Sequence, residues 1–289
     1  MLAASAIWSF GGVLGKSVGV DGVTLSFWRL WIASAVMALV ALARRRLPTR
    51  GEMRASLLAG LLFGLNLCAF FVTLQYTTVA VALIIGALSP VVALPIAAVF
   101  MGEQVTALKV VCALVAVGGV AAAVLTAPGV DDRPTRAVGY AWAVASLAVW
   151  VVYLLQTKRT RRKVATLPFL TSVTWIATVT VCVVAVVTRR DLFGQIEGVG
   201  WLWTVLLALG PGLTGHGLIA WAQPRVDTSV TAMLTQLEPV GASLVAWALL
   251  HERMSMGQSL AMVAVVAALA VLAWSESREG VLALDELPG

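Results

Sequence analysis

Long apolar runs follow one another through nearly the whole of this chain, and only short polar clusters separate them. Of the 289 residues, 60% are hydrophobic and 12% are charged, whereas a soluble domain is about half apolar and about a quarter charged. A helix of roughly 20 apolar residues crosses the hydrocarbon core of a bilayer and satisfies its own backbone hydrogen bonds there. The sequence therefore predicts an all-α polytopic membrane protein whose main partner is the lipid bilayer.

We expect ten transmembrane helices. The apolar runs that predict them cover residues 2–20, 23–43, 54–74, 78–100, 105–126, 138–157, 168–188, 200–222, 227–250 and 256–274. Met1 leads directly into the first run without a basic segment or a small-residue cleavage site. We therefore expect that run to be a permanent span and not a removed signal peptide.

Basic residues gather on one side of the predicted membrane. That side receives Arg44, Arg45, Arg46, Arg50, Arg54, Lys109, Lys158, Arg159, Arg161, Arg162, Lys163, Arg225 and Arg278, and the other receives Arg133, Arg136, Arg189, Arg190 and Arg253. Cytoplasmic loops collect Lys and Arg, so we expect a prokaryotic cytoplasmic membrane and both termini in the cytoplasm. The basic runs are short loops tied to helices, which argues against nucleic acid as a partner.

The chain contains an internal repeat. Residues 86–106 align with residues 235–255 without a gap at an offset of 149, which pairs Pro90 with Pro239 and Glu103 with Glu252. Because each copy would hold five helices, an odd number, the second copy is expected to be inverted. We predict a first repeat at 1–126, an external linker at 127–137, a second repeat at 138–274 and a cytoplasmic tail at 275–289. Transporters built this way bind their substrate between the repeats.

Several short motifs carry a family resemblance. "LSP" and a helix-end Glu in the first half, "LEP" and "HER" in the second, "FWRLW" at 27–31 and "GHGLIAWA" at 215–222 are similar to EamA-type members of the drug/metabolite transporter superfamily. The resemblance covers nearly the whole chain. It implies ten helices in two inverted five-helix halves and transport of small organic molecules, and it does not imply one substrate.

Glu238 is the most informative polar residue. Thr231, Thr235, Glu238 and Ala242 follow one another at helical spacing on one face of residues 227–250, and small or polar faces point toward protein or water in a membrane. Pro239 removes the backbone hydrogen bond to the Thr235 carbonyl, as Pro90 does at the matching position in the first repeat. We expect Glu238 to touch substrate at an interior site. The alternative is that it only bonds neighbouring helices.

Other side chains are candidates for the same site because they combine polarity or aromaticity with a mid-helix position. The predicted substrate-binding set is Trp8, Ser9, Asn66, Trp150, Tyr153, Trp175, His216 and Glu238. The alternative for His216 is a helix contact without substrate, and most other tryptophans are expected at the membrane interfaces.

Four charged residues are predicted to serve in gating or in structure: Lys16, Arg29, Glu103 and Glu252. Lys16 and Arg29 are expected toward the outer surface, with at least one near Glu252. Their alternatives are snorkelling to the interface and an ion pair with Glu252. Gly11 and Gly15 form a G-x-x-x-G pair that favours close approach of a neighbouring helix.

The leading functional prediction is a secondary transporter that exports or exchanges a small organic metabolite by alternating access. An intramembrane lipid-modifying enzyme and a channel or scaffold remain alternatives. The three cysteines, Cys68, Cys112 and Cys182, lack C-x-x-C spacing, so we expect no metal site, and no motif predicts a cofactor. Both a monomer and a homodimer are compatible with the sequence.

Overall fold

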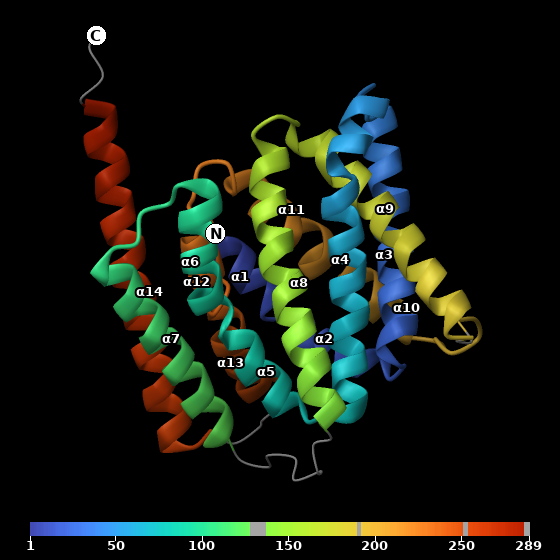
Figure 1. The fold of residues 1–289 in the computed structure, drawn as a ribbon. Coiled ribbons are helices and arrows are strands. Elements are labelled where there is room, and N and C mark those ends of the chain that lie inside the picture. Colours follow the sequence, from blue (N-terminus) through green and yellow to red (C-terminus); the bar gives the residue numbers. More distant parts are fainter. Residues whose placement is uncertain (128–136, 190–191, 251–253, 286–289) are drawn as a thin grey trace.

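The computed structural model is a bundle of helices (Figure 1) and describes residues 1–127, 137–189, 192–250 and 254–285. In order, the helices are α1 (Leu2–Trp8), α2 (Gly11–Val18), α3 (Gly22–Ala43), α4 (Arg50–Tyr76), α5 (Val79–Ala87), α6 (Ser89–Met101), α7 (Ala107–Leu125), α8 (Ala137–Arg161), α9 (Thr166–Val187), α10 (Gly200–Leu207), the π-helix η1 (Ala208–Gly215), α11 (His216–Ala222), α12 (Thr228–Leu234), α13 (Leu237–Leu250) and α14 (Met256–Asp285). No strand occurs among the described residues. The expected all-α fold is confirmed.

Local signals in the sequence set several helix ends. The Asp21 carboxylate accepts from the Val23 N–H at 2.9 Å and so starts α3, and Thr49 and Glu52 form a reciprocal capping box at the start of α4. Such caps satisfy N–H groups that have no partner within the helix. Gly19 and Gly102 end α2 and α6 with φ of 74° and 69°, a conformation that costs little only for glycine.

Eight segments among the described residues are long and apolar enough to cross a bilayer. The N-terminal segment Leu2–Gly15 is apolar but shorter, and it breaks after Trp8 where we predicted one continuous helix over 2–20. Residues 228–250 are likewise divided into α12 and α13. The length criterion thus identifies eight spans among the described residues, and the expected number of ten stays a prediction. Helix α14 continues past Trp274 to Asp285, into the predicted tail.

The breaks in the repeated helices lie before the two prolines. One falls at Leu88, between α5 and α6, and the other at Thr235–Gln236, between α12 and α13. Pro239 has no N–H to donate to the Thr235 carbonyl, and that carbonyl accepts instead from the Glu238 N–H at 3.0 Å. Both breaks lie within one turn before the proline, because a proline disfavours the helical conformation of the residue that precedes it.

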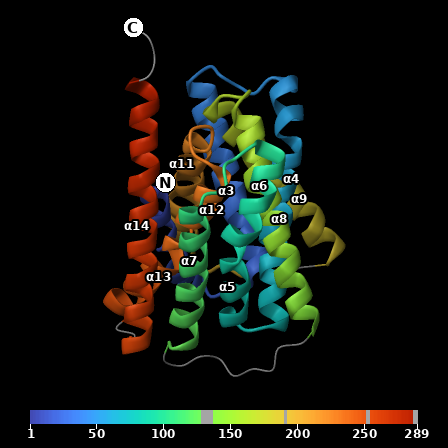
Figure 2. The same ribbon diagram turned by 60° about the vertical axis from the view of Figure 1, so that its left-hand side comes forward.

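Helices from the two halves pack in matching pairs. Within the bundle, α3 packs on α9, α6 on α12 and α7 on α14, while α4 packs on α8 as α2 does on α10. Figure 2 shows the pairing of α7 with α14 along one flank of the bundle. Each pair joins a helix of the first half to one of the second. The core is therefore shared between the halves.

A close helix crossing occurs between α4 and α9, where the sequence did not predict one. A Cβ at Gly60 would meet Ile176 Cβ at 2.6 Å, and one at Gly64 would meet Thr180 Cβ at 2.8 Å, so only glycine lets α4 lie this close to α9. The predicted pair, Gly11 and Gly15, would make only ordinary contacts of 3.7 Å. Its two glycines therefore do not mark a tight crossing.

We expect Gly119→Ala to destabilise the protein and Gly118→Ala, one residue away in α7, to leave it unchanged or slightly more stable. A Cβ at Gly119 would overlap Val265 and approach the Ala261 carbonyl oxygen at 3.1 Å, whereas one at Gly118 meets nothing within 4 Å. Overpacking costs about 1–3 kcal/mol, and alanine in place of a helical glycine gains up to about 1 kcal/mol. Thermal unfolding of both variants in one detergent measures the difference. Equal melting temperatures would contradict close packing of α7 on α14.

Candidate functional site

Five rings from four parts of the chain meet inside the bundle. Trp8 of α1 lies 4.6 Å from His216 and 6.0 Å from Trp150 of α8, between ring centroids. Phe63 of α4 lies 4.6 Å from His216 and 5.3 Å from Tyr153, which stacks on it and lies 5.4 Å from Trp150. These five residues are called the aromatic cluster below. Four of them were predicted from the sequence, whereas Phe63, three residues before Asn66, was not.

The π-helix η1 holds two of these rings in place. The Trp8 indole Nε1 donates to the Pro211 carbonyl at 2.9 Å, and His216 Nδ1 lies 3.2 Å from the same oxygen. The Trp8 indole rests on Gly215, where a Cβ would overlap it. The Pro211 carbonyl of η1 thus accepts from a side chain of α1 and lies next to the ring of His216.

Glu238 and Arg29 stand beside the aromatic cluster. Both side chains are half-buried, and the Arg29 guanidinium lies against η1, where a Cβ on Gly212 would be 3.6 Å from Nη2. From there Arg29 is within electrostatic reach of both Glu238 and His216. Among the described residues, no hydrogen bond or ion pair joins Arg29 directly to Glu238. The two opposite charges therefore interact electrostatically without a direct bond.

The predicted place of Arg29 toward the outer surface stays a prediction. The sequence favoured a place toward the outer surface, with an ion pair to Glu252 as one alternative. Glu252 and the side chain of Lys16 lie outside the described residues, so that pairing stays a prediction for Lys16. Among the described residues, the carboxylate that interacts electrostatically with Arg29 is that of Glu238.

The remaining predicted residues divide into two groups. The Ser9 hydroxyl donates to the Ser5 carbonyl at 2.9 Å and lies 3.5 Å from the Glu238 carbonyl oxygen, at the edge of the site. Asn66 donates to the carbonyl and hydroxyl oxygens of Ser146 at 3.0 and 3.2 Å and so links α4 to α8. Trp175 does not join the aromatic cluster, because its indole donates to the Ser34 carbonyl of α3 at 3.2 Å.

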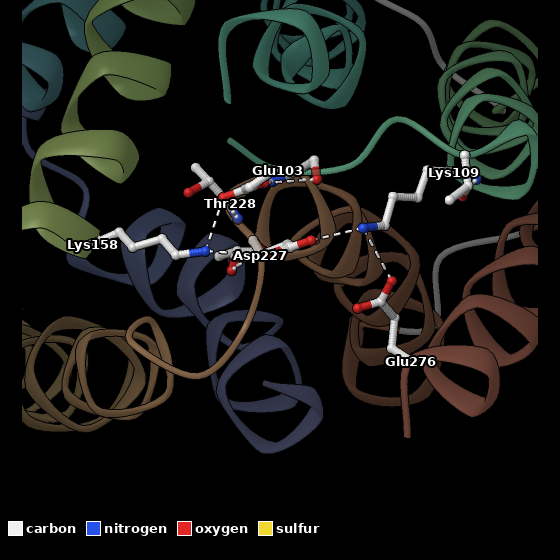
Figure 3. A network of polar contacts seen from close by, with 9 residues as sticks. Glu103, Lys109, Lys158, Asp227, Thr228 and Glu276 are labelled. Atoms are coloured by element: carbon white, nitrogen blue, oxygen red, sulfur yellow. Dashed lines mark hydrogen bonds and ion pairs between the residues drawn. The ribbon is translucent and has the colours of Figure 1, made fainter. Parts of the chain in front are cut away.

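Glu103 belongs to a second group of polar residues (Figure 3). This group lies at the basic end of the bundle, where α8 ends with Lys158, Arg159 and Arg161. The Glu103 carboxylate accepts from the backbone N–H of Thr228 at 2.6 Å and of Ser229 at 3.1 Å, and from Lys158 Nζ at 2.9 Å. Glu103, at the end of α6, therefore caps the first turn of α12 in the other half. The repeat predicted a charge here but gave no sign of these partners.

Further ion pairs extend this group. Asp227 lies between two lysines, 2.7 Å from Lys109 Nζ and 3.3 Å from Lys158 Nζ. Lys109 Nζ also lies 3.2 Å from Glu276 of α14. We call Glu103, Lys109, Lys158, Asp227 and Glu276 the inter-repeat network. Its members come from four stretches of the chain, around residues 103–109, 158, 227 and 276.

The network determines the ionisation of its two carboxyl groups outside the spans. Burial by itself raises the pKa of Glu103, but the Thr228 N–H, Lys158 and the Ser229 N–H outweigh it and hold the pKa below the usual range. Burial also raises the pKa of Asp227, and Lys109 and Lys158 together lower it below its usual range. Both groups are therefore negatively charged at neutral pH.

The central site can hold a small organic molecule by three kinds of contact. A carboxylate accepts hydrogen bonds from an ammonium group, a guanidinium donates to a carboxylate or phosphate, and ring faces attract apolar groups and cations. Among the described residues, no group of three or more His, Cys, Asp or Glu side chains is placed to hold a metal ion.

An apolar helical bundle around an interior polar site is the architecture of a multi-pass membrane protein. The sequence profile of the EamA-like transporter family matches residues 1–125 and 137–274. The chain therefore belongs to this family, within the drug/metabolite transporter superfamily, and is a membrane transporter.

Curated relatives and solved structures agree with this assignment. The "Uncharacterized inner membrane transporter YhbE" of Escherichia coli strain K12 is 27% identical over 233 residues, which cover 75% of this chain and 69% of that protein. The protein of the same name from Shigella flexneri matches equally well. One crystal structure has a TM-score of 0.83 at 21% identity and covers 96% of each chain, which supports the fold alone.

We expect Gly215→Ala to displace the Trp8 indole and Gly210→Ala, in the same π-helix, to have little effect. A Cβ at Gly215 would overlap the indole, while one at Gly210 meets nothing within 4 Å. Overpacking of this kind costs about 1–3 kcal/mol. Thermal unfolding followed by tryptophan fluorescence tests the pair of variants. If the melting temperature of Gly215→Ala equals that of Gly210→Ala, the contact of Trp8 with η1 is wrong.

We expect the network to lose stability in acid. Because the folded-state pKa of Glu103 is depressed, its contribution is complete above its unfolded pKa of about 4.3 and is lost as the pH falls through the lower folded value. Glu103→Gln should lower the melting temperature at pH 7 and should reduce its further fall between pH 5 and the acid limit of folding. Parallel melting curves for the parent and the variant across that range would refute the prediction.

Proposed function

We propose that this protein is a secondary transporter that carries a small organic metabolite, such as an amino acid or a drug-like compound, through a site between its two halves. The observation that carries the proposal is the half-buried pair of Arg29 and Glu238, which interact electrostatically without a direct bond beside the aromatic cluster. Two opposite charges in a membrane interior are costly unless each has a partner. A substrate or water between them supplies that partner.

The proposed substrate has three parts that match the site. Its positively charged or donor group faces Glu238, its negatively charged or acceptor group faces Arg29, and its apolar or aromatic part lies on the aromatic cluster. A solute with only one of these groups leaves a buried charge without a partner, which costs affinity. The site therefore favours amphipathic zwitterions and amines over neutral sugars.

Alternating access is supported by the construction of the repeated helices. Glu238 begins the second part of a helix that is divided at Thr235–Gln236, and the matching helix is divided at Leu88. Gln236 joins the two breaks, because its Nε2 donates to the Ala87 carbonyl at 3.3 Å and to the Ser89 hydroxyl at 3.0 Å. Divided helices at a repeat interface let one half move against the other around a fixed site.

We further propose that the protein lies in the cytoplasmic membrane of a prokaryote, with both termini in the cytoplasm and export as its direction. The charge bias of the loops supports the orientation, and the inner-membrane relatives support the location. Glu238 acts in this proposal as a binding group and not as a proton carrier.

We expect Glu238→Gln to weaken transport by about tenfold or more. The substitution removes the charge and nearly keeps the shape, and a hydrogen bond to a charged group contributes about 1.5–3 kcal/mol. Uptake of labelled amino acids and aromatic amines into liposomes that contain the purified protein measures the effect. Glu197→Gln is the matched control, because it makes the same chemical change at an exposed position.

Two results would overturn the assignment. If Glu238→Gln transports as well as the parent, Glu238 only links helices and the proposed binding role is wrong. No flux of any solute in the panel above that of protein-free liposomes, from a folded protein, would argue against a transporter of this substrate class.

A further inference from the structure

The inter-repeat network connects the two halves at one end of the bundle. Glu103 and Lys109 belong to the first repeat, while Lys158, Asp227 and Glu276 belong to the second. Four ion pairs of 2.7 to 3.3 Å join them, and three of these cross between the repeats: Lys158–Glu103, Lys109–Asp227 and Lys109–Glu276. Across the described ranges, every ion pair between the repeats lies at this end.

The network is attached directly to the helices that contain the central site. Glu103 follows α6 and binds the first N–H groups of α12, and α6 and α12 also pack against each other. These two helices end and begin at the network and lead inward to the breaks at Leu88 and Thr235. Separation of Glu103 from Thr228 would therefore part the two helices that lie between the basic end and Glu238.

The interface consists of buried charges, which suits a contact that must open. The side chains of Glu103 and Lys158 are each 4% exposed. Their attraction is offset by the hydration that they lose on burial, and they regain that hydration when the interface opens. An apolar contact of the same area would have no such compensation, because opening it exposes apolar surface to water.

We propose that the inter-repeat network is the gate at the basic end of this transporter. In the conformation described here the gate is closed. Its opening separates Lys158 from Glu103 and Lys109 from Asp227, and it gives the site at Arg29 and Glu238 access to that side of the membrane. The proposal rests on the alternating-access function proposed above.

The sequence contains a counterpart of the Lys158–Glu103 pair. Lys16 and Lys158 stand at the offset of 142 that also relates Trp8 to Trp150, and Glu252 and Glu103 stand at the offset of 149. Lys158 and Glu103 form an ion pair in the structure, whereas Glu252 and the Lys16 side chain lie outside the described residues. The gate is argued from the described pair alone.

The test measures a distance across the network. Spin labels are attached at Gln104→Cys and Arg225→Cys, two exposed positions on the loops next to Glu103 and Asp227, after replacement of the three native cysteines by alanine. Pulsed electron paramagnetic resonance in lipid nanodiscs then gives the distance distribution. The parent should show one dominant short distance.

Lys158→Met should add a population at longer distance, because it removes the lysine that joins Glu103 to Asp227. Loss of a charged hydrogen bond shifts a two-state equilibrium by about tenfold or more. The matched control is Lys163→Met, which removes the same charge from an exposed side chain of the following turn and should leave the distribution unchanged. Glu103→Gln should shift the distance in the same direction, and the double variant should shift it little further, because both substitutions break one contact.

The outcomes separate the gate from the transport function. An unchanged distance in folded Lys158→Met and Glu103→Gln, or an equal shift in Lys163→Met, would overturn the gate. If Lys158→Met fails to fold, Glu103→Gln decides alone. A shifted distance together with absent solute flux in the parent would support a moving interface and would refute the proposed transport function instead.

Discussion

Backbone carbonyls without helical partners are the constraint around which the centre of this protein is built. A peptide group without a hydrogen bond costs several kcal/mol inside a bilayer. Three carbonyls, two at helix breaks and one inside η1, accept from side chains here, and each donor comes from the other half. Ser5 donates to the Leu234 carbonyl at 2.9 Å, Gln236 donates to that of Ala87, and Trp8 donates to that of Pro211. Each half therefore supplies side-chain donors to backbone carbonyls of the other half.

This mutual completion explains where the candidate site lies. Each break creates polar backbone in the membrane interior, and the side chains that satisfy it bring further polar groups with them. Glu238 follows one break by two residues, and His216 follows the π-helix directly. The aromatic cluster then surrounds the polar groups on the side of α4 and α8. A transporter gains a binding site from the same irregularities that would otherwise only destabilise its helices.

Charges take two contrasting forms in this structure. At the centre, Arg29 and Glu238 are near each other but have no direct bond, which leaves their hydrogen-bonding capacity for a ligand. At the basic end, Lys158 and Glu103 have their capacity filled by each other, by Asp227 and by the N-terminus of α12. The difference lies in the number of partners within reach and not in the residue types. This contrast supports the proposals that the first pair binds substrate and the second closes the gate.

The sequence alone determined the membrane-spanning class, the repeat, the family resemblance and most of the candidate site, including Glu238 and four of the five clustered rings. Those features follow from local hydrophobicity, helical spacing and a constant offset. Only the tertiary structure decided where the helices break, that Phe63 and Arg29 join the site while Trp175 does not, and that Glu103 caps α12. It also placed the tight crossing at Gly60 and Gly64 instead of Gly11 and Gly15. Each of these depends on side chains that meet across tens to hundreds of residues, and helical periodicity contains no information about the partner that a given face will meet.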